Sequence, residues 1–492
     1  MSLLRWYLAL SILAVAVSGL YLYHLDGAGL LGPDEPRYAA IGRAMAESGN
    51  LITPRLWGAP WFEKPPLLYW MAAAGGATGL NPDLAARLPV ALLSLAFLGF
   101  SFWLLQREFD AEVAAVSTAL LATSAGWLAY SELCLTDLPI AVFFSLAVFL
   151  ALPLMREEAQ VTLNGWRFVL IGVCVGLATL AKGLVPLALC VPFFWFLRRF
   201  WQRWWLAFIS CAIVAGPWYV AVYAANGNQF LEDFFWRHHV QRLYSASLQH
   251  VQPWHYYFPV LLGGLFPWTP LLGLLASQRA WWDARRRFLA TVFCFGFLLF
   301  SLSLNKLPGY LLPLFPAMFV LLALQFQRKT AARQYRLWLF PCALLISLIP
   351  MLAQLLPEWL SGGRLSLLPI RSVTRPDLFY VIVSVAVVFV ARRSWAVLLL
   401  ILCITWGGIY LKHIAYPVLD RKVSARGLWR EIKALPGSVC DAGLDREWQY
   451  GLAFYCGSPL PHCSAGKFDF GLRPMPHGPP SVEALNGKAS RF

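Results

Sequence analysis

Long apolar runs separated by short polar segments fill most of the chain. Runs of about 17 to 25 residues recur as far as residue 411, and this is the length that an α-helix needs to cross a hydrocarbon core. The pattern predicts an all-α polytopic membrane protein with about thirteen transmembrane helices. We place them at residues 6–24, 84–106, 111–130, 136–154, 168–180, 184–198, 205–224, 256–278, 288–304, 309–327, 337–356, 376–391 and 394–411.

The first run also has features of a signal peptide, because Arg5 precedes an apolar core that ends in small residues. Its core is long and further spans follow, so we favour an uncleaved helix with a cytoplasmic N-terminus. Basic residues then gather in the cytoplasmic loops, as the positive-inside rule requires. The fifth and sixth helices are kept separate, because merging them around Lys182 would place every later arginine-rich loop outside. The outer face receives a first loop at about 25–83, residues 131–136, 225–255 and 305–310, and the tail from 412.

Composition narrows the function. Hydrophobic residues make up 59% of the chain and charged residues 13%, with a formal net charge of +15. The basic residues lie mainly in short loops, where they act as topology signals and contact anionic lipids, which argues against nucleic-acid binding. The sequence has no glycine-rich phosphate loop, which argues against a cytosolic nucleotide site.

The tail differs in composition from the rest. Residues 412–492 are richer in Gly, Pro and charge, and we expect a small extracytoplasmic α/β domain beside a transmembrane domain of residues 1–411. A helical pattern lies near 428–435, strand patterns lie near 438–440 and 452–455, and the end from Pro474 is predicted to be poorly ordered. Cys440, Cys456 and Cys463 allow three pairings for one disulfide, and the sequence leaves the choice open.

Acidic residues beside an apolar span are functional candidates by default, because they cost free energy unless a ligand or partner compensates them. Asp34 and Glu35 follow the first helix, and Arg37 and Tyr38 come directly after them. Pro36 is placed to open a helix at the membrane interface, with both carboxylates near its N-terminus. The simpler alternative is that an acid only caps that helix.

Two further outer-face clusters contain acids. Glu63 and Lys64 lie in an aromatic, Pro-rich segment that cannot be a spanning helix, and Lys64 is a candidate for a phosphate group or a lysine that snorkels to the interface. Asp137 lies between two apolar spans, where it is either a second functional acid or a helix cap.

The remaining clusters carry histidine, cations and a phenol. His238 and His239 are adjacent, so they do not share one helical face and need a distant partner such as Glu63 to bind a metal. Arg242 follows as a second phosphate candidate. Lys306 and Tyr310 flank a Pro-Gly turn between two spans.

These residue types suit a reaction on a lipid-linked phosphate. A carboxylate deprotonates an acceptor hydroxyl, while lysine, arginine and tyrosine stabilise the departing phosphate. No nucleotide is required.

The motifs resemble those of the bacterial lipid A aminoarabinose transferases, which belong with the protein O-mannosyltransferases among the GT-C membrane glycosyltransferases. The resemblance covers roughly residues 1–411 and rests on Gly32–Tyr38, Pro54–Trp70, Leu135–Asp137, Leu180–Gly183 and Lys306–Tyr310.

The resemblance implies roles for the candidate residues. Asp34 matches the catalytic aspartate and Asp137 a second functional acid, with Glu35 beside the first. The polyprenyl phosphate of the family would contact Arg37, Tyr38, Lys64 and Tyr310, with Arg242 as a secondary companion. Lys306, the cation of the turn before Tyr310, is a further substrate-binding candidate from the residues themselves. Glu63 and His239 match positions that can hold zinc, although the sequence alone requires no cofactor.

The expected protein is therefore a GT-C glycosyltransferase of the bacterial inner membrane. It would move aminoarabinose or another monosaccharide from a polyprenyl-phosphate donor to an extracytoplasmic acceptor such as lipid A, a glycan or a protein hydroxyl. The alternatives are a protein O-mannosyltransferase and a non-catalytic transporter or flippase of polyprenyl-linked sugars.

The chain and its tail are short for an aminoarabinose transferase, and Trp61 stands where tyrosine is common, so the sugar and the acceptor stay open. A Trp-Trp-Asp triplet at 281–283 resembles an oligosaccharyltransferase motif and is interpreted as an interfacial anchor.

Overall fold

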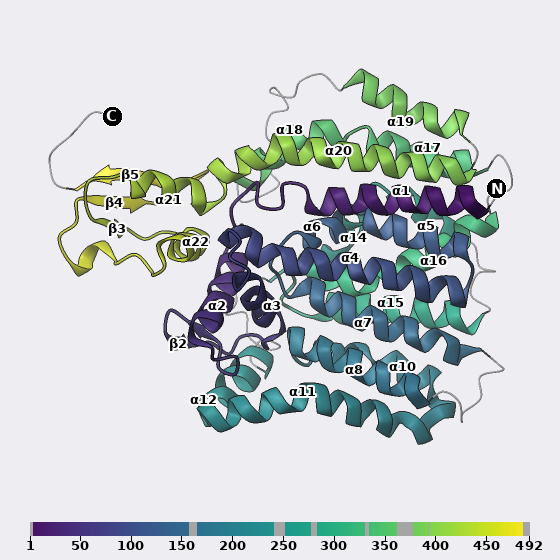
Figure 1. Ribbon diagram of the computed structural model, residues 1–492, viewed down its shortest axis with the longest axis horizontal. Coiled ribbons are helices and arrows are strands. Elements are labelled where there is room, and N and C mark those ends of the chain that lie inside the picture. The colour runs from purple at the N-terminus through teal and green to yellow at the C-terminus, as the bar shows by residue number, and fades with distance from the viewer. Residues whose placement is uncertain are drawn as a thin grey trace.

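The computed structural model describes residues 3–156, 165–240, 251–276, 283–329, 334–361, 377–391 and 393–485. Its long helices lie side by side, with the N-terminus at one end of the bundle and the C-terminal strands beyond the other (Figure 1). The short helices α2 and α3 lie across the end nearer the strands. The bundle therefore has two distinct ends, and the first predicted outer loop is at one of them.

The helices of the first half are α1 (Leu3–Leu22), α2 (Asp34–Ser48), α3 (Leu67–Gly76), α4 (Pro82–Glu108), α5 (Ala111–Ala122), α6 (Ala125–Ser131), α7 (Asp137–Ala151), α8 (Gly165–Lys182), α9 (Val185–Leu189), α10 (Val191–Phe196), α11 (Trp204–Asn226) and α12 (Asn228–Leu231). Those of the second half are α14 (Tyr257–Gly264), α15 (Ala284–Leu302), α16 (Phe315–Lys329), α17 (Tyr335–Ile346), α18 (Ile349–Ser361), α19 (Leu378–Val390), α20 (Arg393–Lys422), α21 (Ala425–Lys433) and α22 (Arg446–Cys456). Short 3-10 or π turns extend several of them, among them η4 (Glu232–Val240), η7 (Thr269–Ala276) and η9 (Pro308–Leu314).

Helices occupy each predicted span, but several spans are broken. Within the described residues, six helices are long and apolar enough to cross a membrane, or nine if each bent pair counts as one span. The bends are 66° between α5 and α6, 111° between α14 and η7, and 47° between α17 and α18. The chain is therefore a multi-pass membrane protein, and the count of thirteen stays a prediction.

Two helices form the centre of the bundle. Some 83% of the span that begins with α7 and 94% of the span of η9 and α16 are buried inside the protein, so neighbouring helices separate both from lipid. Helices α8 and α11 approach each other closely because small residues lie between them. A Cβ atom at Gly172 of α8 would lie 2.2 Å from the Ala207 carbonyl oxygen of α11. Gly172 and Gly176 form a Gly-x-x-x-Gly pair, the spacing that lets membrane helices touch along their backbones.

The first outer loop contains α2, a short β-hairpin whose strands have two residues each, and α3. The predicted helix after Asp34 is confirmed, but it begins at Asp34 itself, two residues before Pro36, and ends at Gly49 with a left-handed φ of 68°. Strands β1 (Arg55–Leu56) and β2 (Ala59–Pro60) form the hairpin. Gly42 allows α3 to pack on α2, because a side chain there would lie 2.5 Å from Cβ of Ala72.

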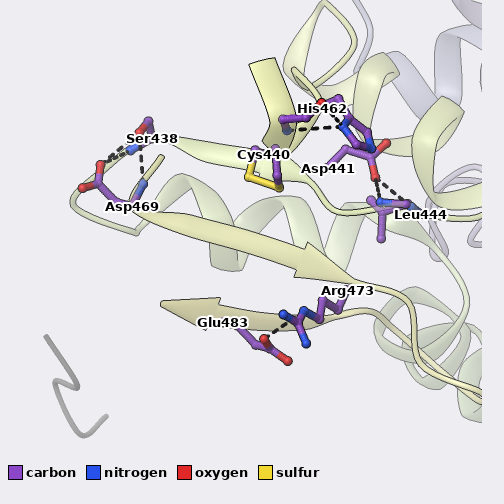
Figure 2. Close-up of a disulfide and its surroundings, with 11 residues drawn as sticks. Ser438, Cys440, Asp441, Leu444, His462, Asp469, Arg473 and Glu483 are labelled. Carbon is purple, nitrogen blue, oxygen red and sulfur yellow. Dashed lines mark hydrogen bonds and ion pairs between the residues drawn. A yellow bond between two sulfur atoms is a disulfide. The ribbon is translucent and has the colours of Figure 1, made fainter. Parts of the chain in front are cut away.

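The tail carries a three-stranded sheet in the order β3 (Val439–Asp441), β4 (Phe470–Arg473) and β5 (Ser481–Ala484). β3 pairs parallel to β4, and β4 pairs antiparallel to β5. A disulfide joins Cys440 of β3 to Cys463, which leaves Cys456 free (Figure 2).

The strand predicted at 452–455 is wrong, because those residues belong to α22. Trp448 and Leu452, four residues apart, both face the small core of the tail, which is helical rather than strand spacing. The boundary that we predicted at residue 411 falls inside α20, which continues without a break to Lys422.

Candidate functional site

Asp34 lies in the first turn of α2, beside a buried arginine. Nη2 of Arg37 lies 2.6 Å from Oδ1 of Asp34 and 3.0 Å from Oε2 of Glu63. The Asp34 side chain is 40% exposed, whereas that of Arg37 is 11% exposed. The arginine therefore fixes the aspartate at the N-terminus of α2 while leaving it accessible.

Aromatic rings surround the Arg37 guanidinium. Its carbon lies 5.2 Å from the ring centres of Tyr38 and Trp61, and 5.5 Å from that of Tyr450, which comes from α22 in the tail. Burial lowers the pKa of the Arg37 guanidinium, but Glu63, Tyr38 and Asp34 beside it together raise that pKa by more, so it lies above its ordinary value. Arg37 therefore stays charged in this aromatic enclosure.

Glu35 points away from Asp34 and into the protein. Nε and Nη2 of Arg87 each lie 2.8 Å from one of its oxygens, and both groups are buried. Its carboxylate also accepts hydrogen bonds from the backbone N–H groups of Leu31 and Cys134. Arg87 in turn donates to the carbonyl groups of residues 25, 28 and 29. The pair fastens the start of α2 to α4.

A second acid and base pair lies where three helical segments meet. Asp137, in the first turn of α7, accepts a 2.6 Å hydrogen bond from Nζ of Lys182 at the end of α8. The Lys182 nitrogen also lies 4.4 Å from the ring centre of Tyr310. Gly309 is required here, because a Cβ atom would lie 2.2 Å from Oδ1 of Asp137. The N-cap position of α7 is Thr136, and Asp137 is the first residue of the helix, where its carboxylate pairs with Lys182.

A cavity of about 610 Å³ is lined by Lys182 of this pair and by Glu63, which contacts Arg37. Its charged lining residues are Glu63, Lys64 and Lys182, and the phenol of Tyr310 also lines it. The rest of the wall is mostly apolar, from Ile140, Leu184, Val185, Ala188, Leu299, Phe300, Leu302, Leu304 and Pro313. Lys64 is buried, and its Nζ lies 2.9 Å from Oε1 of Glu63. A mostly apolar cavity with two lysine side chains in its wall suits a lipid chain with an anionic head.

Polar atoms without hydrogen-bond partners lie at and around Arg37. Within the described residues, Nε of Arg37, Nε1 of Trp61 and the hydroxyl of Tyr69 are buried without a hydrogen-bond partner. Tyr69 lies beside Tyr38, with ring centres 5.8 Å apart, and burial raises the pKa of both hydroxyls, so both keep their protons. Buried donors without partners are rare in folded proteins and often mark a ligand site.

The other predicted residues lie apart from this cluster or outside the described part of the chain. Arg242, the side chain of His239 and residues 281–282 are outside the described residues. Lys306 is buried, and its ammonium group donates to the carbonyl oxygens of Gln252 and Ser303, so it holds the loop that precedes η9.

The zinc prediction stays a prediction. No group of three or more His, Cys, Asp or Glu residues suited to a metal occurs in the part of the chain that the structure describes. Both oxygens of Glu63 lie within 3.0 Å of a cation, Arg37 on one side and Lys64 on the other. This environment does not fit a metal ligand, because the neighbouring positive charges oppose a second cation.

Sequence reasoning did not assign Lys182, Arg87, Tyr69 or Tyr450 to the site. A lone lysine in the turn between two apolar helices was a usable signal for Lys182, since it lies on the same predicted face as Asp137. Tyr450 gave no such signal, because it reaches Arg37 from the tail, which the motifs do not include.

Fold and site together define a multi-pass helical membrane protein with an apolar cavity that ends in a charged cluster. Comparison with known proteins is consistent with this class. The family model described as dolichyl-phosphate-mannose-protein mannosyltransferase matches residues 6–243.

Individual relatives narrow the class. The undecaprenyl phosphate-alpha-4-amino-4-deoxy-L-arabinose arabinosyl transferase 1 of Pseudomonas fluorescens is 33% identical over 326 residues, which is 63% of this chain and 56% of the relative. The crystal structure of ArnT from Cupriavidus metallidurans in the apo state superposes with a TM-score of 0.75 at 22% identity, covering 94% of this chain and 86% of that one. The same protein bound to undecaprenyl phosphate gives a TM-score of 0.73 at 24% identity, over 94% and 86% of the two chains.

These comparisons confirm the resemblance found in the motifs: the chain is similar to the aminoarabinose transferases and shares the fold of ArnT. The chain spans little more than half the length of the curated relative from Pseudomonas fluorescens that it matches.

Proposed function

We propose that this protein is a glycosyltransferase that moves a sugar from a polyprenyl-phosphate-linked donor to a hydroxyl group of an extracytoplasmic acceptor. The observation that carries the proposal is the 610 Å³ cavity, whose apolar wall suits a polyprenyl chain and whose lining residue Glu63 contacts Arg37, the partner of Asp34. The names of the relatives support a donor of this class.

Two roles in the reaction fall to the residues at the site. Lys64, Lys182 and Tyr310 bind the donor phosphate and stabilise its charge as it leaves. Asp34 accepts the proton of the acceptor hydroxyl. The acceptor oxygen then forms a bond to the anomeric carbon, the bond from that carbon to the phosphate oxygen breaks, and its electron pair leaves with the lipid phosphate. A single displacement of this kind inverts the anomeric centre.

Two predicted acids take different parts. Asp137 holds Lys182 toward the cavity through their 2.6 Å contact. Glu35, which the sequence predicts as a catalytic candidate beside Asp34, is assigned a positioning role instead, because its oxygens are engaged by Arg87 and by backbone N–H groups. Arg37 orients Asp34, and Tyr38 packs against Arg37.

The wider setting is part of the same proposal. We place the protein in the bacterial inner membrane with thirteen spans and a cytoplasmic N-terminus. The site and a C-terminal domain of residues 412–492 are then extracytoplasmic. Lipid A or another envelope glycolipid is the preferred acceptor, and aminoarabinose or another monosaccharide is the sugar. A protein hydroxyl is the second candidate, favoured by the mannosyltransferase family model that matches residues 6–243.

The test uses full-length protein in detergent and a donor labelled in the sugar. Wild type should release free polyprenyl phosphate and transfer the label, whereas Asp34→Asn should bind donor with unchanged affinity and transfer nothing. Glu47→Gln is the matched control, because Glu47 is an exposed acid on the same helix. A wild-type protein that binds donor but leaves it intact would favour the transporter alternative.

A further inference from the structure

A second, smaller cavity lies between the first outer loop and the tail. Its volume is about 180 Å³, and its walls include Trp57 at the tip of the hairpin, Tyr450 and Gln449 of α22, and Asp441 of β3. It is smaller than the ~300–1,000 Å³ of sites for drug-sized ligands, so it suits one ring rather than a chain. The 610 Å³ cavity and this one share no lining residue.

Trp57 occupies an unusual backbone position. Its φ is 51° and that of Gly58 is 85°, so both central residues of the hairpin turn are left-handed. Turns of this type favour asparagine or aspartate before glycine, and a bulky aromatic residue there is a conformational outlier. The ring is not in the core either, since Trp57 is 38% exposed. An exposed ring kept at a strained position points to a binding role.

The polar side of the small cavity is fixed in place. Oδ1 of Asp441 accepts hydrogen bonds from the backbone N–H groups of Gly443 and Leu444, and Oδ2 accepts one of 3.0 Å from Nε2 of Gln449. The disulfide at Cys440 lies next to Asp441 in the chain (Figure 2). A carboxylate and an amide held beside an aromatic ring form the combination that binds a sugar, because ring C–H groups stack on the aromatic face and hydroxyls bond to the polar groups.

The charge of the lining selects among ligands. Asp441 is the one charged group among the described residues that line this cavity, and it is an acid. A phosphate would be repelled here, whereas a neutral or amino-substituted sugar would be accepted.

The position of the small cavity relates it to the proposed reaction. The ring of Tyr450 stacks on Trp57 at 5.4 Å between centres and faces Arg37 at 5.5 Å. Arg37 contacts Glu63 of the donor cavity on its other side. Arg37, the ion-pair partner of Asp34, therefore contacts one lining residue of each cavity. In a single displacement the acceptor approaches from the side opposite the leaving phosphate.

We propose that the Trp57 cavity binds a sugar ring of the acceptor, so that the tail supplies one wall of the active site. This inference rests on the proposed glycosyltransferase function. It names the acceptor class as a glycan or glycolipid rather than a protein.

The test measures steady-state transfer by the full chain in detergent, with a labelled undecaprenyl-phosphate sugar as donor and a glucosamine-disaccharide lipid of the lipid A class as acceptor probe. Trp57→Asn removes the ring and supplies a residue that the turn favours. The KM for the acceptor should rise about tenfold in this variant, the loss expected for one stacked ring, while the KM for the donor changes less than about twofold. Trp57→Phe should restore most of the acceptor affinity. Met475→Asn, which alters an exposed residue of the tail outside the cavity, is the control.

Three outcomes overturn the proposal: an unchanged acceptor KM in Trp57→Asn, an equal rise of both KM values, or a selective rise only for a Ser/Thr peptide acceptor. If wild type releases no polyprenyl phosphate, the proposed function fails instead. The cavity is then tested by saturation-transfer NMR with the free glucosamine disaccharide. Signal transfer that is present in wild type and lost in Trp57→Asn supports a sugar site, and no transfer to wild type refutes it.

Discussion

Replacing Arg87 by lysine tests how firmly the active-site helix is anchored. The guanidinium makes five hydrogen bonds, two to Glu35 and three to backbone carbonyl groups, at 2.6–3.0 Å. A lysine ammonium has three donors, so Arg87→Lys loses at least two of these bonds. Each hydrogen bond to a charged group contributes roughly 1.5–3 kcal/mol, which predicts a loss of about 3–6 kcal/mol in the free energy of unfolding.

The assay is denaturant unfolding of the detergent-purified protein, compared with two other variants. Glu35→Gln leaves the Arg87 charge buried without a counterion and should cost about 3–5 kcal/mol. Arg430→Lys is the control, because Arg430 is 58% exposed in its ion pair with Asp420 and should change stability by less than about 1 kcal/mol. An Arg87→Lys protein as stable as Arg430→Lys would refute the view that this buried pair fastens α2 to α4.

Further predictions concern the larger cavity. Gly309→Ala should abolish transfer, because the added Cβ would lie 2.2 Å from Oδ1 of Asp137. Gly263→Ala is the control and should keep full activity, because an added Cβ there meets no atom within 4 Å. Equal activity of the two variants would contradict the close approach of Gly309 to Asp137. Lys182→Met should raise the KM for the donor by at least about tenfold, because it loses a charge-assisted contact to the donor phosphate. Lys182→Arg should retain part of the donor affinity. An unchanged donor KM in Lys182→Met would remove Lys182 from the phosphate site. Because cations already flank both oxygens of Glu63, EDTA should leave the transfer rate unchanged, and a loss of activity that zinc restores would show this assignment to be wrong.

Several parts of the site depend on contacts between residues that are far apart in the sequence. Local pattern was enough to find the cluster at Asp34 and Glu35, but not to separate their roles. Consecutive residues of a helix point about 100° apart, so one acid meets Arg37 and the other turns inward. That inward partner, Arg87, is 52 residues away, and no local pattern identifies it.

The same limit applies to the other contacts. Lys182 meets Asp137 across 45 residues, and the hairpin meets Tyr450 of the tail across a much longer separation. Helix positions were predictable from apolar run length, whereas the bends at α5–α6 and α14–η7 were not, since hydropathy does not record direction. In the tail, a short apolar run near Leu452 is compatible with either helix or strand, and packing against the tail core selected the helix.

The central claim is that this protein transfers a sugar and that Asp34 is the base. The most direct measurement is mass spectrometry of envelope lipids, glycans and proteins from a deletion strain complemented with wild type or with Asp34→Asn, at matched levels of the protein in the membrane. Our account predicts that wild type alone restores a sugar modification, carried by a glycan or glycolipid. Equal restoration by Asp34→Asn would contradict it.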